Sequence, residues 1–336
     1  MQKLKLQSFC HLTESVLKLL NQNRISTILD FIQEDLSKLT TITRLNLPEI
    51  LAIRNAIFAK YSAPLHNGTI IIEKVLKNRR YLNTDIESID NITDGGIPIG
   101  YITEICGLAD SGKTQLSFQL AINCVKNRDR TVLYVDTKGD FSAVRIQKIL
   151  SQQNFSYKQM SVIMQRIRVI NIWTMHELVC LLKDVKNSTL GIENLGLIIF
   201  DSLPCLMLQH LGDENKIGLS YLNNVVNYSR FIGNELNVAL IYVNIQTRWI
   251  EPDICDIEDN VESTSAFKGS AFNEKRLRCL GKYWEEIPAL VLQLEKKDVS
   301  NNPSDVLSIK VSVISCNNIR NLGKECIIYI NNNGVM

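Results

Sequence analysis

The residues best suited to chemistry in this 336-residue chain form the run Gly107–Thr114, Gly-Leu-Ala-Asp-Ser-Gly-Lys-Thr. Its spacing matches the phosphate-binding loop G-x-x-x-x-G-K-[ST]. Backbone N–H groups of such a loop surround phosphate oxygens, Lys113 is expected to reach the β- and γ-phosphates, and Thr114 is expected to ligate Mg²⁺. An apolar run over 101–106 predicts a strand before the loop, and a mostly apolar helix follows it. The predicted nucleotide-binding residues are Gly107, Leu108, Ala109, Asp110, Ser111, Gly112, Lys113, Thr114 and Gln115.

An acidic side chain ends a later apolar run. Leu195–Phe200 has the pattern of a buried strand, and Asp201 follows it, 88 positions after Lys113. By itself this pattern usually marks only the end of a strand. After a phosphate-binding loop, it is typical of the carboxylate that holds Mg²⁺ in a P-loop ATPase. We therefore predict ATP and Mg²⁺ as cofactors, with the metal at Thr114 and Asp201.

The composition favours a folded protein with a sizeable core. Apolar residues make up 45% of the chain and charged residues 21%, which argues against disorder. No stretch approaches the roughly 20 apolar residues of a membrane span, and the N-terminal residues lack a signal-peptide run. Nine scattered cysteines without a C-x-x-C pair argue against a disulfide framework or a zinc site, and four histidines without a ligand-like pairing are expected to have ordinary structural roles. We expect reduced, mostly buried thiols in an intracellular protein.

Positive charge is concentrated near the N-terminus. Residues 1–80 carry a net charge of +6, whereas the other 256 residues carry −4. A polyanion partner near the N-terminus and a merely solvated surface explain this bias equally well. The basic cluster Lys77, Arg79 and Arg80 allows phosphate contact or a solvated hinge, of which we favour the hinge.

Three short amphipathic helices are predicted in the first part of the chain. Thr13–Ser15 can cap the first helix, Ser26–Thr27 can cap the second, and Pro48 fits the first turn of a third over Leu47–Tyr61. The apolar residues expected on their faces are Val16, Leu17, Leu19, Leu20, Ile28, Leu29, Ile32, Leu36, Leu51, Ile53, Ile57 and Phe58. Three such helices can share one small core.

The second part alternates between strand and helix patterns, which indicates a mostly parallel sheet. The expected strands are 131–135, 168–172, 195–200 and 238–243, and the expected helices are 142–152, 175–185 and 217–236. Three late apolar runs suggest an antiparallel extension at one sheet edge: 289–294, 307–315 and 327–330. We predict a helical N-terminal domain over 1–62, a linker over 63–82 and an ATPase domain over 83–336.

These motifs resemble those of the eukaryotic RecA-like recombinase family. The segment from Asp90 to Ile105 is similar to that family's LD…GGhxxGxhTEh lead-in, and Lys113–Gln115 is similar to its GKTQ. Further similar segments are Val132–Thr137, Arg145–Ile146, Val238–Asn244, Leu280–Pro288 and Ile330–Val335. The first 65 residues resemble the N-terminal domain of the D-paralogue branch. The resemblance implies an α/β fold, a RecA-like P-loop ATPase core with a mostly parallel sheet, after a small all-helical N-terminal domain.

Two departures from the family's pattern concern hydrolysis. Active members carry a glutamate that polarises the attacking water where this chain has Lys138. A protonated lysine is no general base, and Asp140 lies two residues farther along, too far to place the water. The family's Asn-Gln sensor of the γ-phosphate is Asn244-Ile245 here, and Gln246 comes one residue late. We expect ATP binding with slow hydrolysis or none, unless a trans-acting group supplies the base.

The segment after Asn244 is the second region of departure. In strand-exchange members this loop holds single-stranded DNA. Here six acidic residues fall within twelve positions: Glu251, Asp253, Asp256, Glu258, Asp259 and Glu262. Carboxylates repel phosphates, so we expect no strand exchange by this chain alone. A basic set that could restore a DNA contact follows: Lys268, Lys275, Arg276, Arg278 and Lys282.

The resemblance implies an ATP-binding adaptor or mediator in homologous-recombination DNA repair, with no confidently assigned catalytic residue. It would bind single-stranded DNA in a nuclear hetero-oligomer with other recombinase paralogues of the B, C and XRCC types, and no membrane. The C paralogue would contact the ATPase domain, and the XRCC-type partner would contact the N-terminal domain or linker. The alternative is an active DNA-dependent ATPase motor, either a recombinase or a RecA-type helicase. A third option is a nucleotide-binding regulatory module unrelated to DNA.

Overall fold

The computed structural model describes residues 12–61, 67–69, 72, 81–126, 129–210, 216–250, 274–297 and 306–336. The chain divides into two units, Met1–Asn78 and Arg79–Met336. The first unit has one hydrophobic core and the second unit has two, so each unit is described by itself. Within the described residues, no helix is long and apolar enough to cross a membrane.

The described residues of the first unit form α1 (Glu14–Gln22), α2 (Ile28–Gln33), α3 (Leu36–Thr43) and α4 (Leu47–Tyr61). The predicted caps of the first two helices are confirmed. The Thr13 hydroxyl accepts the N–H of Val16 at 3.4 Å, and Thr27 forms a capping box with Asp30.

The predicted extent of the second helix is wrong. Its pattern placed Leu36 on the same face as Ile28, but α2 ends at Gln33 and Leu36 begins α3. The break comes from Asp35, whose extended backbone leaves the helix and whose carboxylate accepts the N–H of Ser37 at 3.2 Å. Asp35 thereby caps the new helix, because its carboxylate satisfies an N–H group that the first turn of a helix leaves unpaired.

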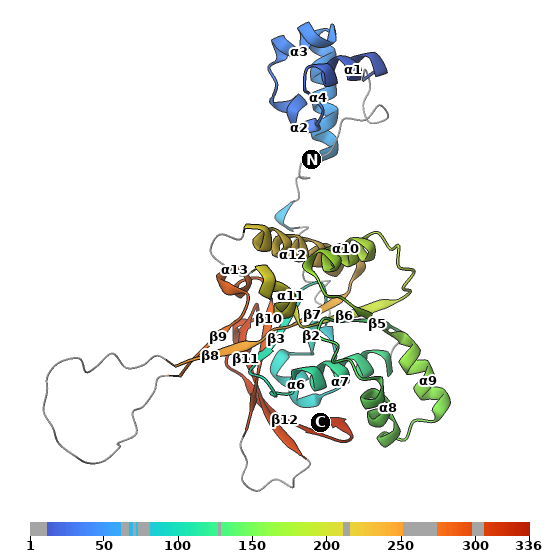
Figure 1. Cartoon of the computed structure of the whole chain (residues 1–336), viewed down its shortest axis with the longest axis vertical. Coiled ribbons are helices and arrows are strands. Elements are labelled where there is room, and N and C mark those ends of the chain that lie inside the picture. Colours follow the sequence, from blue (N-terminus) through green and yellow to red (C-terminus); the bar gives the residue numbers. More distant parts are fainter. Residues whose placement is uncertain are drawn as a thin grey trace, which may run out of the picture. The chain divides into compact units, whose positions relative to one another are not determined.

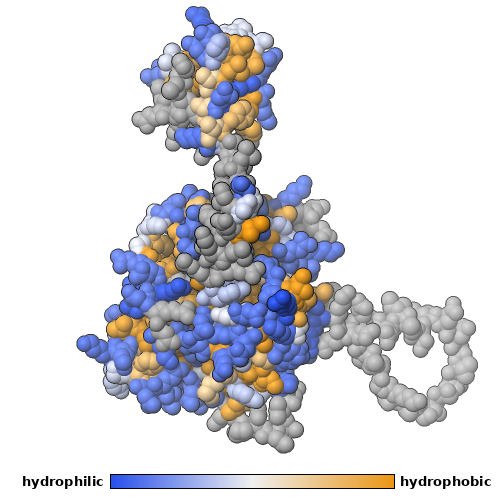
Figure 2. Space-filling view, turned by 180° about the vertical axis from the view of Figure 1, so that it is seen from behind, coloured by the Kyte–Doolittle hydropathy of each residue, from blue (hydrophilic) through white to orange (hydrophobic). Residues whose placement is uncertain are grey.

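The third predicted helix is confirmed as α4, but its buried face differs from the prediction. Ile53 and Ile57 are buried as expected, together with Ile50, and they pack in the core of this unit. Leu51 and Phe58 are 40% and 48% exposed, because they lie on the other side of the helix from this stripe. Figure 2 shows hydrophobic residues exposed on the visible face of the first unit.

A nine-stranded sheet in the order β13-β12-β11-β10-β3-β7-β6-β4-β5 forms the centre of the second unit. Its strands are β3 (Ile102–Gly107), β4 (Thr131–Asp136), β5 (Ile167–Asn171), β6 (Leu195–Asp201), β7 (Ala239–Val243), β10 (Leu290–Lys296), β11 (Leu307–Cys316), β12 (Glu325–Asn331) and β13 (Gly334–Val335). The short strands β1 (Tyr81–Leu82) and β2 (Ile97–Pro98) pair with each other, as do β8 (Gln246–Ile250) and β9 (Glu274–Arg278).

The late strands extend the sheet as predicted, with one difference in direction. Strands β11, β12 and β13 form antiparallel pairs, but β10 runs parallel to β3. Six neighbouring strands from β10 to β5 are therefore parallel, and the change of direction comes between β10 and β11. The mostly parallel α/β sheet of the predicted fold is confirmed.

Helices cover both faces of this sheet (Figure 1). The residues of α6 (Glu87–Thr93), α7 (Lys113–Lys126), α8 (Ala143–Gln152) and α9 (Tyr157–Arg166) join one core, and those of α10 (Met175–Lys186), α11 (Leu203–Met207), α12 (Lys216–Leu236) and α13 (Gly281–Glu285) join the other. Successive side chains of strand β4 belong alternately to the two cores. Val132 and Tyr134 belong to the first core, and Leu133 and Val135 belong to the second.

Candidate nucleotide site

The predicted site residues meet at the carboxyl ends of the parallel strands. The run Gly107–Thr114 connects β3 to α7, and Asp201 is the last residue of β6. The neighbouring strand β4 ends at Asp136, which pairs in register with Asp201. This edge is where open α/β sheets bind ligands, because the loops that connect strands to helices converge there.

Glycines are required at both ends of the phosphate-binding loop. A Cβ atom on Gly107 would lie 2.4 Å from the carbonyl oxygen of Leu294. A Cβ on Gly112 would lie 2.5 Å from Cδ1 of Ile330, and its φ of +84° also favours glycine. The loop thus lies directly against β10 and β12. A larger residue at position 107 would require the backbone of β10 to shift, whereas at position 112 it would displace the end of the Ile330 side chain and strain the backbone at its positive φ.

Lys113 folds back into the loop. Its Nζ donates to the carbonyl oxygens of Gly107 and Leu108 at 3.0 and 2.5 Å and to the Ser111 hydroxyl at 3.2 Å. Burial, followed by the neighbouring charge of Lys138, lowers the pKa of Lys113. An anion in the loop would oppose both effects, since it would add the negative charge that this ammonium lacks.

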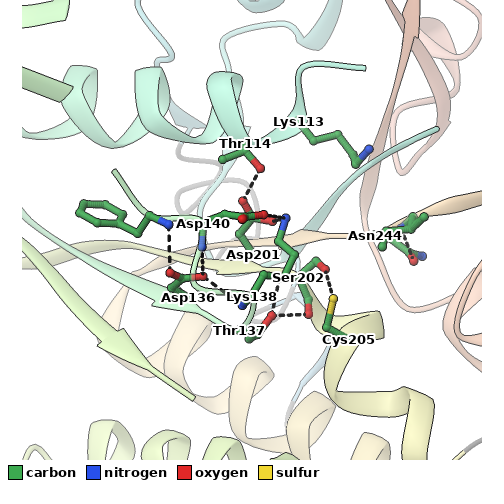
Figure 3. A network of polar contacts seen from close by, with 12 residues as sticks. Lys113, Thr114, Asp136, Thr137, Lys138, Asp140, Asp201, Ser202, Cys205 and Asn244 are labelled. Atoms are coloured by element: carbon green, nitrogen blue, oxygen red, sulfur yellow. Dashed lines mark hydrogen bonds and ion pairs between the residues drawn. The ribbon is translucent and has the colours of Figure 1, made fainter. Parts of the chain in front are cut away.

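Asp201 is the centre of a buried polar network (Figure 3). One of its carboxylate oxygens accepts hydrogen bonds from the Thr114 hydroxyl at 2.7 Å and from the Tyr134 hydroxyl at 2.9 Å. Its other oxygen forms an ion pair with Nζ of Lys138 at 2.9 Å. Burial and the charge of Asp201 raise the pKa of Tyr134 well above its normal range, so this hydroxyl remains a donor. The structure thus brings Thr114 and Asp201 together, as the sequence predicted, and adds a cation.

Lys138 is held in place by the loop that follows β4. Both carboxylate oxygens of Asp136 accept backbone N–H groups of this loop, and the donors are Lys138, Gly139, Asp140 and Phe141 at 3.0 to 3.3 Å. The Thr137 hydroxyl exchanges hydrogen bonds with the backbone of Ser202 at 2.7 and 2.8 Å. This ties the loop to the end of β6. The side chain of Lys138 also pairs with Asp140 at 3.3 Å.

The expected sensor position contains no side chain that can donate to a phosphate. Asn244 donates to a buried glutamate, Glu104, and to the carbonyl of Cys279, both at 2.9 Å. Ile245 is apolar. Gln246 is buried near β3, where its amide nitrogen lies 3.9 Å from the sulfur of Cys106. Its amide oxygen has no partner among the described residues.

The basic set after the acidic segment is partly engaged in ion pairs. Arg276 pairs with Glu295 at 2.6 Å, and Arg278 pairs with Glu104 at 2.9 Å. These guanidinium groups are therefore already neutralised by carboxylates. Lys282 lies on α13. Several predicted contacts lie outside the described residues or side chains: Lys77, Arg79, Arg80, Lys268, Lys275 and the acidic positions of 251–262.

The sequence reasoning missed two polar residues of the site, Glu104 and Tyr134. Both lie inside apolar strands and are almost fully buried. A charged residue within an otherwise apolar strand was the available signal for Glu104, because an unpaired buried charge is too costly to retain. The thiols also differ from expectation. Of the seven described cysteines, only Cys106 and Cys124 are buried.

Comparison with known proteins decides the family. The family model named Rad51 matches residues 77–248, just over half of the chain. The chain belongs to the Rad51 family. A second model, the RAD51D N-terminal domain, matches residues 1–60 of this Rad51-family chain. Both the predicted RecA-like fold and the resemblance to the D branch are confirmed.

The relatives of this Rad51-family chain include several DNA repair proteins. It is 28% identical over 242 residues to DNA repair protein RAD51 homolog 4 of Mus musculus, covering 70% of this chain and 74% of the relative. The Bos taurus protein of that name is 26% identical over the same length, with the same coverage of both chains. A DNA repair and recombination protein RadB of Methanococcoides burtonii is 26% identical over 168 residues, 49% of this chain and 70% of the relative.

Proposed function

We propose that this chain is an ATP-binding adaptor or mediator of homologous-recombination DNA repair, with weak or absent hydrolysis of its own. The observation that carries the proposal is the ion pair between Lys138 and Asp201 at 2.9 Å. It puts a fixed ammonium beside the carboxylate where an active ATPase needs a base and a water.

ATP fits the loop. Gly107 and Gly112 leave no room for a side chain, and Lys113 is buried at its centre with only neutral oxygens as partners. A triphosphate would supply the missing negative charge, and Gly107–Gln115 are the residues that would hold it. The bound nucleotide would act by stabilising one conformation of a subunit contact.

Among the residues that the structure describes, the carboxylates near Lys138 are already engaged by other groups. Asp136 has both oxygens occupied by backbone N–H groups. Asp140 pairs with Lys138 itself. A carboxylate whose oxygens are engaged in this way is not free to hold and activate the attacking water. Slow turnover follows, unless a partner subunit supplies a base.

The names of the relatives support a proposal for the partners and the location of this chain. These are named as DNA repair proteins and include homologs 2, 3 and 4 of RAD51. We propose that this chain works beside other recombinase paralogues of the B, C and XRCC types, on single-stranded DNA, in the nucleus. The domain boundaries proposed for it are 1–62, 63–82 and 83–336.

A steady-state ATPase assay with single-stranded DNA, combined with retention of labelled ATP, tests this function. We expect ATP to be retained by the full chain and lost in Lys113→Ala, with turnover far below about one per second. Turnover near that rate, abolished by Lys113→Ala, would instead support the motor alternative. Failure to retain ATP, even with the natural partners present, would contradict the proposal.

Filter binding to a single-stranded oligonucleotide tests the DNA partner separately. Phosphate contacts release counterions, so the affinity should fall steeply between two salt concentrations. Absence of binding by the complex with its partners would favour the regulatory module unrelated to DNA.

A further inference from the structure

We propose that the Lys138 ammonium takes the place of the divalent cation at Asp201, so that this chain binds nucleoside triphosphate without requiring Mg²⁺. The proposal rests on the nucleotide binding proposed above and deepens it. It departs from the Mg²⁺ site predicted at Thr114 and Asp201.

The arrangement around Asp201 does not suit Mg²⁺. The Thr114–Asp201 hydrogen bond alone is compatible with a metal, because the hydroxyl oxygen keeps lone pairs. The other oxygen of Asp201 is the obstacle, because the Lys138 Nζ lies 2.9 Å from it. A divalent cation at this carboxylate would face an ammonium within a buried site, where like charges repel strongly. Either Lys138 leaves or the metal stays out.

Lys138 is built into this position. Four backbone N–H groups bound by Asp136 shape its loop, and Thr137 ties the loop to Ser202 beside Asp201. Its side chain is only 25% exposed. Its Nζ lies between two carboxylates, 2.9 Å from Asp201 and 3.3 Å from Asp140, which favour its charged form.

The charges around the loop complete the argument. Lys113 has no carboxylate among its hydrogen-bond partners, which are two backbone carbonyls and the Ser111 hydroxyl. Two ammonium groups on the same side of the sheet therefore provide positive charge for a triphosphate. In related sites, a metal ion neutralises the negative charge that the phosphates carry and the charge that develops on them during the reaction.

The test is the dissociation constant of a fluorescent ATP analogue for the full chain, measured in Mg²⁺ and in EDTA. For the wild type we expect the two constants to agree within about fivefold. In Lys138→Gln, which keeps a polar side chain but is one atom shorter and loses the charge, EDTA should weaken binding by about tenfold or more relative to Mg²⁺. Lys138→Arg should behave as the wild type. Lys158→Gln, an exposed lysine on α9, is the matched control and should also behave as the wild type.

The wild-type ratio alone suffices if Lys138→Gln does not fold. A wild-type constant that rises more than about fivefold in EDTA overturns the inference and leaves ATP binding intact. So does a Lys138→Gln variant that folds and shows the wild-type ratio. If neither the wild type nor Lys138→Arg binds the analogue in either buffer, the proposed function fails and the inference fails with it.

Discussion

At the residue scale, the buried carboxylate of Glu104 connects the strand before the phosphate-binding loop to the β8–β9 hairpin. It accepts hydrogen bonds from Asn244, Arg278 and the Trp284 indole at 2.9 to 3.0 Å. Glu104 lies three residues before Gly107 on β3, and Arg278 is the last residue of β9. One side chain therefore links the hairpin to the strand that leads into the nucleotide loop.

Burial outweighs these partners and raises the pKa of Glu104 above its usual value of 4.5. At pH values between 4.5 and the raised pKa of Glu104, the folded state then binds more protons than the unfolded state. Stability contributed by Glu104 is consequently lost as the pH rises through this window. We predict that the free energy of unfolding of the wild type, relative to Glu104→Gln, falls as the pH is raised from about 4.5 towards neutrality.

Denaturant unfolding at several pH values measures this difference. Glu295→Gln is the matched control. Glu295 pairs with Arg276, which lies on the same strand as Arg278, but Glu295 is partly exposed. Its difference from the wild type should change little with pH. A relative stability of the wild type that rises with pH would contradict the prediction and show that Arg278 dominates.

At the element scale, the loop between β4 and α8 is organised by one carboxylate. Asp136 is 2% exposed and uses both oxygens to accept four backbone N–H groups. An asparagine has one acceptor oxygen, and its amide would face the N–H of Phe141. We predict that Asp136→Asn lowers the free energy of unfolding by about 2 kcal/mol. It should also release Lys138 from its position and raise the Mg²⁺ dependence of ATP binding.

Thermal unfolding and the paired binding assays check both effects. Asp140→Asn is the control, because the Asp140 side chain is 61% exposed and forms only the second ion pair of Lys138. A variant Asp136→Asn with wild-type stability would mean that water replaces these hydrogen bonds at no cost.

At the scale of the whole molecule, the two units have separate cores and should unfold separately. Ile53 is 1% exposed in the core of the first unit, whereas Leu51 on the same helix is 40% exposed. We predict that Ile53→Ala destabilises the first unit by about 2–4 kcal/mol and that Leu51→Ala changes it far less. Calorimetry of the full chain should show that only one of two transitions shifts. A shift of both transitions by Ile53→Ala would contradict this separation.

Much of this organisation could be predicted from the sequence. The capping by Thr13 and Thr27, the helix over Leu47–Tyr61 and the strand before Gly107 depend on residues close together in the chain. Local hydrogen bonds and periodicity determine such features. The errors arose where one position had two compatible interpretations. Asp35 could continue a helix or cap the next, and Leu51 and Ile53 are equally apolar.

The sequence by itself determined the phosphate-binding loop and the alternation of strand and helix, because both are patterns of near neighbours. It also located the departure at Lys138. Only the tertiary structure decided where that lysine points. Thr114 lies in the first turn of α7, which follows β3; Lys138 lies in the loop after β4; and Asp201 ends β6. Their meeting depends on the strand order β3-β7-β6-β4 and its register. Long-range packing sets that register, so the ion pair with Asp201 appears only when the sheet is assembled.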